Sequence, residues 1–470
     1  MKPYKYEIFT SVIEEQIRNG AVKENDRLPS VREIRKTYRL STSSVQSGFE
    51  YLLIRGLIKS SPRSGYFVAA QTQNGEHRKT DRLPPVVRNE AFMKNMMLTS
   101  KRISEAGFFN AAAPGDLLIP QKLILRTMQE VLREKGASLL RYYPSNGLEP
   151  LRYQIAKQMN RYGCLLNPDE LIITDGALQA LTIALKSVTK PGDIVAVDSP
   201  CVFSVLEVIT NLELKVVEIP VSCDSGFDLE SFRTACEENN IRALVVTPNF
   251  HNPTGTLMSD STKKDLLGIA ENYRVSIIEN DMYSDLYFGE KRPCSIKSFD
   301  TKGLVMMYSS FSKTLAPGIR LGWLYAGYLY SKAERVKFSL GRSVSPVYQE
   351  LILKLLQSSS YERHLRTFRR KLNDQAVQLS GVLEKYFPSG SCFYKPEGGY
   401  SIWAQLPEKT DLELFYQYCE KHGIMFTPGE TFSFSGSYGH YFRIVFSERI
   451  TAESILLLES AGRKAKELLL

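Results

Sequence analysis

Short apolar segments alternate with helical stretches along most of this 470-residue chain, from about residue 108 onward. The apolar segments have the length of buried strands, and they span residues 171–174, 194–197, 244–247, 275–279 and 304–308. Helical stretches such as 178–188 and 263–273 lie between them. Strands that alternate with helices predict an α/β domain with a mostly parallel sheet.

Polar residues follow these predicted strands. Asp175 with Gly176, Asn252, Asp281 and Lys313 each come after an apolar segment. In open α/β sheets the chemistry gathers at the carboxyl ends of the strands. We therefore expect these side chains to lie close together.

Lys313 lies in the tract YSSFSKTLAPGIRLGW, where its amine is flanked by groups that suit a phosphate. The hydroxyls of Ser310 and Ser312 and the forked guanidinium of Arg320 are such groups. In TDGALQAL, the expected start of a helix at 176–178 offers free backbone N–H groups, which attract phosphate.

Asp281 ends a buried strand, where an unpaired carboxylate would be costly and a pyridinium nitrogen would satisfy it. Asn252, in PNFHNPTG, can donate to a phenolate oxygen. An imine-forming lysine, an aspartate on a ring nitrogen and a phosphate cup together indicate a pyridoxal phosphate site. Taken singly, these residues would be an ordinary surface lysine, a helix N-cap and a turn, and only their order and placement make the prediction specific.

The first 70 residues follow a different pattern. Residues 4–20 have the spacing of an amphipathic helix, Ser30 and Glu33 form a capping-box pair before a short second helix, and Ser41 to Ser44 precede a third helix over 45–55. The segment LIKSSPRSGYFVAA then alternates around a turn, as a hairpin does. This order predicts a winged helix-turn-helix.

Charge is concentrated at the same end. Residues 1–70 hold 12 Lys and Arg against 7 Asp and Glu, and residues 71–110 hold 7 against 4, so most of the net charge of +9 lies there. A basic end fits a nucleic-acid contact, although a solvated basic surface would give the same counts. Residues 71–105, with Pro84-Pro85, have the composition of a linker.

The sequence argues against a membrane protein, a secreted protein, and a protein with disulfide bonds or a metal site. No stretch approaches the roughly 20 apolar residues of a membrane helix, and the N-terminus has no signal-peptide pattern, so we expect a cytoplasmic location without a membrane partner. The seven cysteines are scattered without a CxxC pair, which argues against a disulfide framework or a metal site.

Residues 4–68 resemble the GntR-type DNA-binding domain, through LPSVRE at 28–33 and SSPRSGYFV at 60–68. The resemblance implies that the third helix enters the major groove of double-stranded DNA and that the wing touches its backbone or bases. The residues it implies as DNA contacts are Arg32, Ser41, Ser43, Ser44, Gln46, Arg63 and Gly65. That family commonly has arginines at the positions of Thr42 and Gln46, which leaves the sequence preference open. A winged helix used only for protein contacts is the alternative.

The ordered set SPCVF, HNPTG, ENDMYSD, SSFSK, GIRLGW and FRIVF resembles fold-type I aminotransferases over about 108–465. The resemblance implies an internal aldimine on Lys313, Asp281 on the ring nitrogen, and a partner subunit that receives Tyr142. It implies Asn252 and Tyr283 on the ring oxygen, Ser310, Ser312, Arg320 and the backbone of Ala177 and Leu178 on the phosphate, and Arg443 on a substrate α-carboxylate. Val202 stands where the family usually has an aromatic ring, so either the neighbouring Phe203 substitutes for that ring or stacking is lost.

Together the two resemblances are those of the MocR-type transcription regulators. They imply a winged helix-turn-helix at 1–70, a linker at 71–105, and at 106–470 an α/β fold-type I domain with a small C-terminal α+β subdomain. They also imply a head-to-tail homodimer whose DNA binding responds to pyridoxal phosphate or its adduct with an amino compound. We hypothesise that exchange of the Lys313 imine closes the C-terminal subdomain and changes the spacing of the two winged helices. An aminotransferase with a DNA-binding appendage and a regulator whose large domain is only a dimerisation scaffold remain alternatives.

Overall fold

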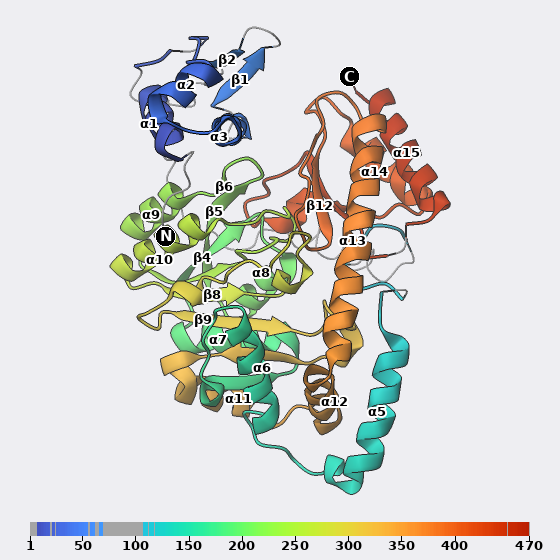
Figure 1. Cartoon of the computed structure of the whole chain (residues 1–470). Helices are drawn as coiled ribbons and strands as arrows, with labels where there is room; N and C mark the ends of the chain where they lie inside the picture. Colours follow the sequence, from blue (N-terminus) through green and yellow to red (C-terminus); the bar gives the residue numbers. More distant parts are fainter. Residues whose placement is uncertain are drawn as a thin grey trace. The chain divides into compact units, whose positions relative to one another are not determined.

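The computed structural model describes residues 7–18, 21–23, 25–54, 57–61, 65–68, 107–110, 112–116, 118–448 and 450–469 (Figure 1). The chain divides into two compact units, Met1–Asp81 and Arg82–Leu470. The predicted linker at 71–105 lies outside the described residues.

The N-terminal unit is the expected winged helix-turn-helix. It contains the helices α1 (Glu7–Arg18), α2 (Val31–Tyr38) and α3 (Thr42–Ile54), followed by the antiparallel strands β1 (Ile58–Ser61) and β2 (Gly65–Val68). Phe9, Val45, Phe49 and Leu52 are fully buried between these elements. The ring of Phe49 stacks on that of Tyr66 with 4.1 Å between centroids, which ties α3 to the wing.

Side chains at the helix starts explain where α2 and α3 begin. The Ser30 hydroxyl accepts from Glu33 N at 3.3 Å and Ser30 N donates to the Glu33 carboxylate at 2.7 Å, which confirms the capping box. Ser41 Oγ accepts from Ser44 N at 3.1 Å. The third helix therefore begins at Thr42, three residues before the predicted start, because Ser41 already caps it.

The large unit contains an eight-stranded sheet in the order β3-β10-β9-β8-β7-β4-β5-β6. Its members are β3 (Leu171–Thr174), β10 (Gly322–Tyr325), β9 (Val305–Ser310), β8 (Ser276–Asn280), β7 (Ile241–Val246), β4 (Ile194–Ser199), β5 (Lys215–Ser222) and β6 (Gly226–Phe227). The five strands from β9 to β5 are parallel, while β10 and β6 are antiparallel to their neighbours. The prediction of a mostly parallel α/β sheet is thus confirmed.

Helices cover both faces of this sheet (Figure 1). On one face, Ile172, Val245 and Ile278 pack in one apolar cluster with α7 (Gly176–Val188), α8 (Phe203–Asn211) and α11 (Tyr330–Leu340). The opposite face packs against α6 (Glu149–Arg161), α9 (Leu229–Glu238), α10 (Asp260–Tyr273) and α12 (Pro346–Gln357). Neighbouring strand residues such as Ile172 and Ile173 lie in different clusters, as the pleat requires. The helix α5 (Gln121–Lys135) precedes the sheet.

A second, smaller sheet lies toward the C-terminus, in the order β11-β12-β14-β13. It consists of β11 (Cys392–Phe393), β12 (Ser401–Gln405), β14 (Tyr441–Val445) and β13 (Thr427–Pro428), all antiparallel. It shares an apolar core with α13 (Ser359–Tyr386), α14 (Leu412–Lys421) and α15 (Ala452–Glu467). This is the expected small α+β subdomain. None of the described helices is long and apolar enough to cross a membrane.

Candidate functional site

A cavity of about 330 Å³ opens where β7, β8 and β9 end. Thr247 follows β7, Asn280 ends β8 and Ser310 ends β9, and all three line it. Ten of the residues predicted for a cofactor or its ligand line the same cavity, namely Ala177, Leu178, Phe203, Asn252, Tyr283, Ser310, Ser312, Lys313, Arg320 and Arg443. The carboxyl ends of the parallel strands bring them together from distant parts of the sequence.

Lys313 lies in the turn between β9 and β10, and its half-buried side chain lines the cavity. The amine donates to the carbonyl of Ala112, and the hydroxyl of Tyr400 donates to the backbone carbonyl of Lys313. Burial, with the nearby charges of Arg443 and Arg320, lowers the pKa of the Lys313 amine to about 8. A neutral, nucleophilic amine is therefore accessible near neutral pH, which an exposed lysine does not offer.

Several hydrogen-bond donors line the cavity around Lys313. The Ser312 hydroxyl is buried and has no hydrogen-bond partner among the described residues. The start of α7 has no side-chain cap, since the Asp175 side chain makes no capping bond. The guanidinium of Arg320 lies beside Gly176 and donates to the Asp175 carbonyl at 3.3 Å. Free N–H groups, a hydroxyl and a guanidinium are what a phosphate requires.

Asn252, Tyr283 and Arg443 form a connected group on another wall. Asn252 Nδ2 donates to the Tyr283 hydroxyl oxygen at 3.1 Å, and Arg443 Nη1 donates to Asn252 Oδ1 at 3.1 Å. Burial raises the pKa of the Tyr283 hydroxyl and lowers the pKa of Arg443 to about 10. Arg443 Nε is buried with no hydrogen-bond partner in the described part of the chain, so this guanidinium has capacity for an anion.

Val202 and Phe203 both line the cavity at the start of α8. The Phe203 ring packs against Phe432, with 6.0 Å between ring centroids and 59° between the planes. An aromatic side chain is thus present at this wall, one residue after the position where the sequence comparison expects it.

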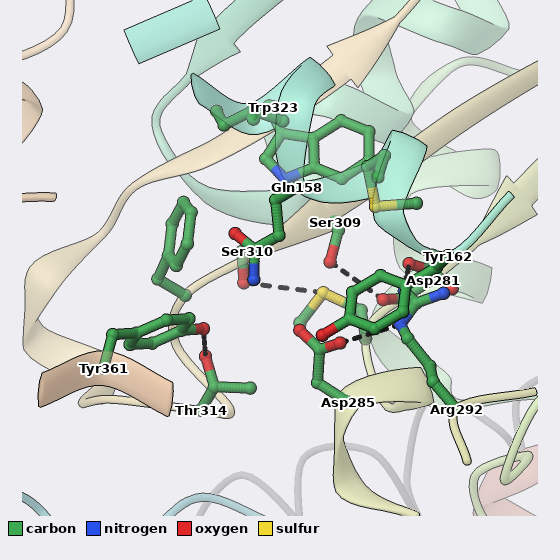
Figure 2. A pocket seen from close by; sticks show the side chains of 14 residues that line it. Gln158, Tyr162, Asp281, Asp285, Arg292, Ser309, Ser310, Thr314, Trp323 and Tyr361 are labelled. Carbon is green, nitrogen blue, oxygen red and sulfur yellow. Dashed lines mark hydrogen bonds and ion pairs between the residues drawn. The ribbon is translucent and has the colours of Figure 1, made fainter. Parts of the chain in front are cut away.

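Asp281 is not brought into this cavity. Its carboxylate forms an ion pair with Arg292 and accepts from the Ser284 hydroxyl, and all three side chains are buried. Figure 2 shows Asp281 and Arg292 at a different pocket, with Tyr162 and Asp285 on its walls. The expectation that Asp281 faces the cavity is corrected for a simple reason: β8 ends at Asn280, and successive side chains of an extended segment point to opposite sides.

Where their side chains are described, the predicted DNA contacts are exposed on the N-terminal unit, except for the half-buried Ser44. Arg32 lies in the first turn of α2, Gln46 on α3, and Ser41 with the half-buried Ser44 at the start of α3. Gly65 begins β2 with φ +105°, in a region that favours glycine. The side chain of Ser43 and all of Arg63 lie outside the described residues.

Comparison with known proteins assigns both units. Residues 7–68 match the bacterial regulatory proteins of the gntR family, and residues 114–455 match the aminotransferase class I and II family. The uncharacterized HTH-type transcriptional regulator YdcR of Escherichia coli is 33% identical over 93% of this chain and 94% of its own. A second regulator of that description from the same organism, YjiR, is 31% identical over 94% of each chain.

This chain belongs to the GntR-type transcriptional regulators that carry an aminotransferase class I and II domain. The large unit of this regulator is also similar to a solved structure, LysN, an α-aminoadipate aminotransferase from Thermus thermophilus. LysN is 25% identical, with a TM-score of 0.73 and coverage of 81% of this chain and 98% of its own. That structure is complexed with N-(5'-phosphopyridoxyl)-L-leucine.

Tyr142 of the regulator does not line the cavity of its own chain. Its side chain is 76% exposed, and the guanidinium of Arg342 lies over its ring at 4.8 Å. It follows Leu140, whose side chain is 88% exposed. Two large exposed side chains so close together are unusual on a free surface.

Several lining residues of the regulator were not predicted. They are Asn110, Ala112, Ala113, Thr247, Asn280, Met282 and Tyr308, with others around Val202 and Pro317. Thr247 and Asn280 could have been found, because each stands at the end of an apolar segment. Asn110, Ala112 and Ala113 carry no such signal, since they lie in the sequence before every strand of the eight-stranded sheet.

Proposed function

We propose that this protein is a DNA-binding transcription regulator that binds pyridoxal 5'-phosphate covalently through Lys313. Pyridoxal phosphate, or its adduct with an amino compound, is its effector. The observation that carries the proposal is the amine of Lys313, with a pKa lowered to about 8, in one cavity with the buried hydroxyl of Ser312, which has no partner among the described residues.

The residues of the cavity fit this cofactor. Ser310, Ser312, Arg320 and the N–H groups at the start of α7 would hold the phosphate, because they are hydrogen-bond donors at this cavity and the Ser312 hydroxyl has no partner among the described residues. Asn252 and Tyr283 would hold the ring oxygen. The cofactor supplies an aldehyde that combines reversibly with amines, which is how an amino compound could be sensed.

Arg443 is the candidate for an effector carboxylate. Its guanidinium faces the cavity from β14 and keeps one buried N–H without a partner in the described part of the chain. A bidentate pair with a carboxylate would satisfy it. The similar aminotransferase LysN holds a phosphopyridoxyl–leucine compound, which supports an amino acid as the class of effector. Arg443 lies in the C-terminal subdomain and Lys313 in the main sheet domain. An effector held by both residues would therefore connect the two subdomains.

DNA recognition would use the exposed residues of the N-terminal unit. Arg32 and Gln46 can pair with base edges or phosphates, and Ser41 and Ser44 with phosphates. An effector can change DNA affinity only if it binds two arrangements of the protein with different affinities. We propose that the two arrangements differ in the spacing of the winged helices of a head-to-tail homodimer.

A homodimer is further supported by exposed apolar side chains on α5 and the segment after it. Leu125 and Leu132 lie seven residues apart on α5, so they share one face, and both are exposed. Leu140 and Tyr142 follow. We propose that this face is covered by the second subunit and that Tyr142 completes the partner's phosphate site.

The experiment combines cofactor attachment with DNA binding. Purified full-length protein is mixed with pyridoxal phosphate and treated with borohydride, and the modified lysine is located by mass spectrometry. We expect the modification on Lys313 and none on Lys302, whose side chain is 65% exposed and serves as an internal control. A selection for bound DNA sequences then supplies an operator whose affinity is measured with and without the cofactor.

The outcomes separate the alternatives. An adduct on Lys313 with a changed DNA affinity supports the proposal. No adduct would leave the large domain as a dimerisation scaffold. Rapid multiple-turnover transfer of an amino group to a 2-oxo acid would favour the second candidate, an aminotransferase with a DNA-binding appendage, which the ten cofactor-type residues in the cavity also support.

A further inference from the structure

Two adjacent polar residues at the end of β8 face different cavities. Asn280 is the last residue of the strand and lines the cavity that holds Lys313. Asp281 follows it and lines the pocket of Tyr162 and Arg292 (Figure 2). Only one of two successive side chains in an extended segment can face a given side. The residue that faces the Lys313 cavity is therefore an amide and not a carboxylate.

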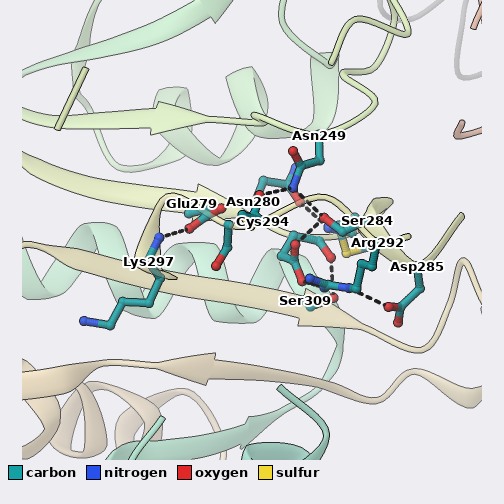
Figure 3. Close-up of polar contacts among 12 residues, drawn as sticks. Asn249, Glu279, Asn280, Ser284, Asp285, Arg292, Cys294, Lys297 and Ser309 are labelled. Atoms are coloured by element: carbon teal, nitrogen blue, oxygen red, sulfur yellow. Dashed lines mark hydrogen bonds and ion pairs between the residues drawn. The ribbon is translucent and has the colours of Figure 1, made fainter. Parts of the chain in front are cut away.

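Asp281 is held in its own pocket by charge. Its carboxylate pairs with Arg292 and accepts from Ser284 Oγ. Arg292 also donates to Asp285 at 2.7 Å (Figure 3). The guanidinium lies over the ring of Tyr162 at 4.8 Å. Asp281 is 4% exposed and Arg292 is 8% exposed. Turning the carboxylate toward the cavity would leave a buried arginine without half of its counter-charge, which is strongly unfavourable.

Asn280 presents a free donor to the cavity. Its Oδ1 accepts from Met282 N at 3.2 Å, which settles the orientation of the amide. Nδ2 makes no hydrogen bond among the described residues, although the side chain is only 6% exposed. The same cavity wall carries Tyr283 and Tyr308. An NH₂ group that faces the cavity without a partner among the described residues can donate to an acceptor bound there.

We propose that Asn280, and not Asp281, faces the ring nitrogen of bound pyridoxal phosphate and keeps that nitrogen unprotonated. This inference rests on the proposed function. An amide NH₂ donates to the lone pair of a neutral pyridine, whereas a carboxylate would hold a proton on the nitrogen by charge pairing. Asn280 thus acts as a positioning and tuning residue toward the cofactor.

The consequence concerns what the site does with an amino compound. A neutral ring withdraws electrons less strongly than a protonated one, so loss of the α-proton from a bound amino compound is slowed. A site with Asn280 binds and retains an amino compound instead of converting it. Retention suits a sensor, because the occupied state then reports concentration and does not decay through turnover.

The test places an isotope on the ring nitrogen. Full-length protein is loaded with pyridoxal phosphate labelled with ¹⁵N in the ring, attachment to Lys313 is verified with borohydride, and the ¹⁵N chemical shift is recorded. We expect the wild type at the position of neutral pyridine and Asn280→Asp at the position of protonated pyridine. Asn280→Asp is also expected to consume a bound amino acid at least about tenfold faster, as a barrier lower by about 1.4 kcal/mol would produce.

Asp281→Asn is the matched control, since it exchanges the same two functional groups at the neighbouring position. It is expected to leave the ¹⁵N shift at the neutral position, and its circular dichroism spectrum shows whether it is folded. A protonated nitrogen in the wild type, or a shift that responds to Asp281→Asn and not to Asn280→Asp, overturns the inference while the proposed function stands. Absence of any Lys313 adduct in the wild type overturns both.

Discussion

The amine of Lys313 has a pKa of about 8 instead of its ordinary 10.5, because burial and two nearby guanidinium groups disfavour its protonated form. Only the neutral amine can attack an aldehyde. We therefore expect the rate of covalent attachment of pyridoxal phosphate to rise as the pH increases through about 8 and to level off above it. Stopped-flow absorbance over this range measures the rate. A profile that still rises steeply near the ordinary lysine pKa would contradict the burial of the amine.

Gly176 lies at a second position where the backbone conformation and the space beside it favour glycine. Its φ is +76°, and a Cβ there would lie 2.8 Å from Arg320 Nη2. Gly176→Ala should lower stability by about 1 kcal/mol through its backbone and also displace Arg320, so affinity for pyridoxal phosphate should fall. Gly192→Ala is the control, because Gly192 has φ +85° and nothing within 4 Å of its Cβ position. Equal loss of cofactor affinity in both variants, measured by fluorescence titration, would refute a role for the Arg320 contact.

The chemistry-bearing residues could mostly be predicted from the sequence, and the exception is instructive. No other candidate for the same role stands next to Lys313, Asn252 or Arg443 in the sequence. Each could therefore be assigned to the site without a choice between neighbours. Asn280 and Asp281 are adjacent, and the predicted strand ended at residue 279 where β8 ends at 280. A shift of one residue exchanges the sides that two neighbours face. The sequence therefore favoured the carboxylate of Asp281 as the group that faces the cavity. Only the observed end of β8 and the ion pair of Asp281 with Arg292 show that the amide of Asn280 faces it instead.

At the level of elements, the strands of the eight-stranded sheet with continuous apolar sequence were predicted, whereas β5, β6 and β10 and the four strands of the smaller sheet were not. β5 contains Glu218 and Pro220, which weaken a strand signal. The Glu218 carboxylate instead accepts a hydrogen bond from Phe434 N at 2.8 Å. β10 has only four residues and begins two residues after Arg320, so its sequence was interpreted as part of the phosphate motif. Short strands become recognisable only once their neighbours are known.

The start of α2 offers a prediction for the N-terminal unit. Ser30 caps this helix, and removing such a cap costs about 1 kcal/mol. Ser30→Ala should therefore lower the thermal transition of the N-terminal unit and leave that of the large unit unchanged. Differential scanning calorimetry of the full chain measures both. Ser47→Ala serves as the control, because Ser47 is exposed on α3 and alanine is the better helix former. A fall in the large unit's transition would show that the two units do not unfold separately.

At the scale of the whole molecule, dimerisation and cofactor binding should be coupled through α5 and the segment that follows it. Leu125, Leu132 and Leu140 expose apolar surface next to Tyr142, which does not line the cavity of its own chain. A Leu125→Glu/Leu132→Glu double variant should become monomeric, because charges would replace the apolar contact, and its affinity for pyridoxal phosphate should fall as Tyr142 is withdrawn from the partner's site. Light scattering with a cofactor titration measures both effects, and Leu456→Glu, at a 64% exposed position on α15, should change neither. A monomeric variant that still binds the cofactor with wild-type affinity would show that each subunit completes its own site, and the dimer would then serve only to space the two winged helices on DNA.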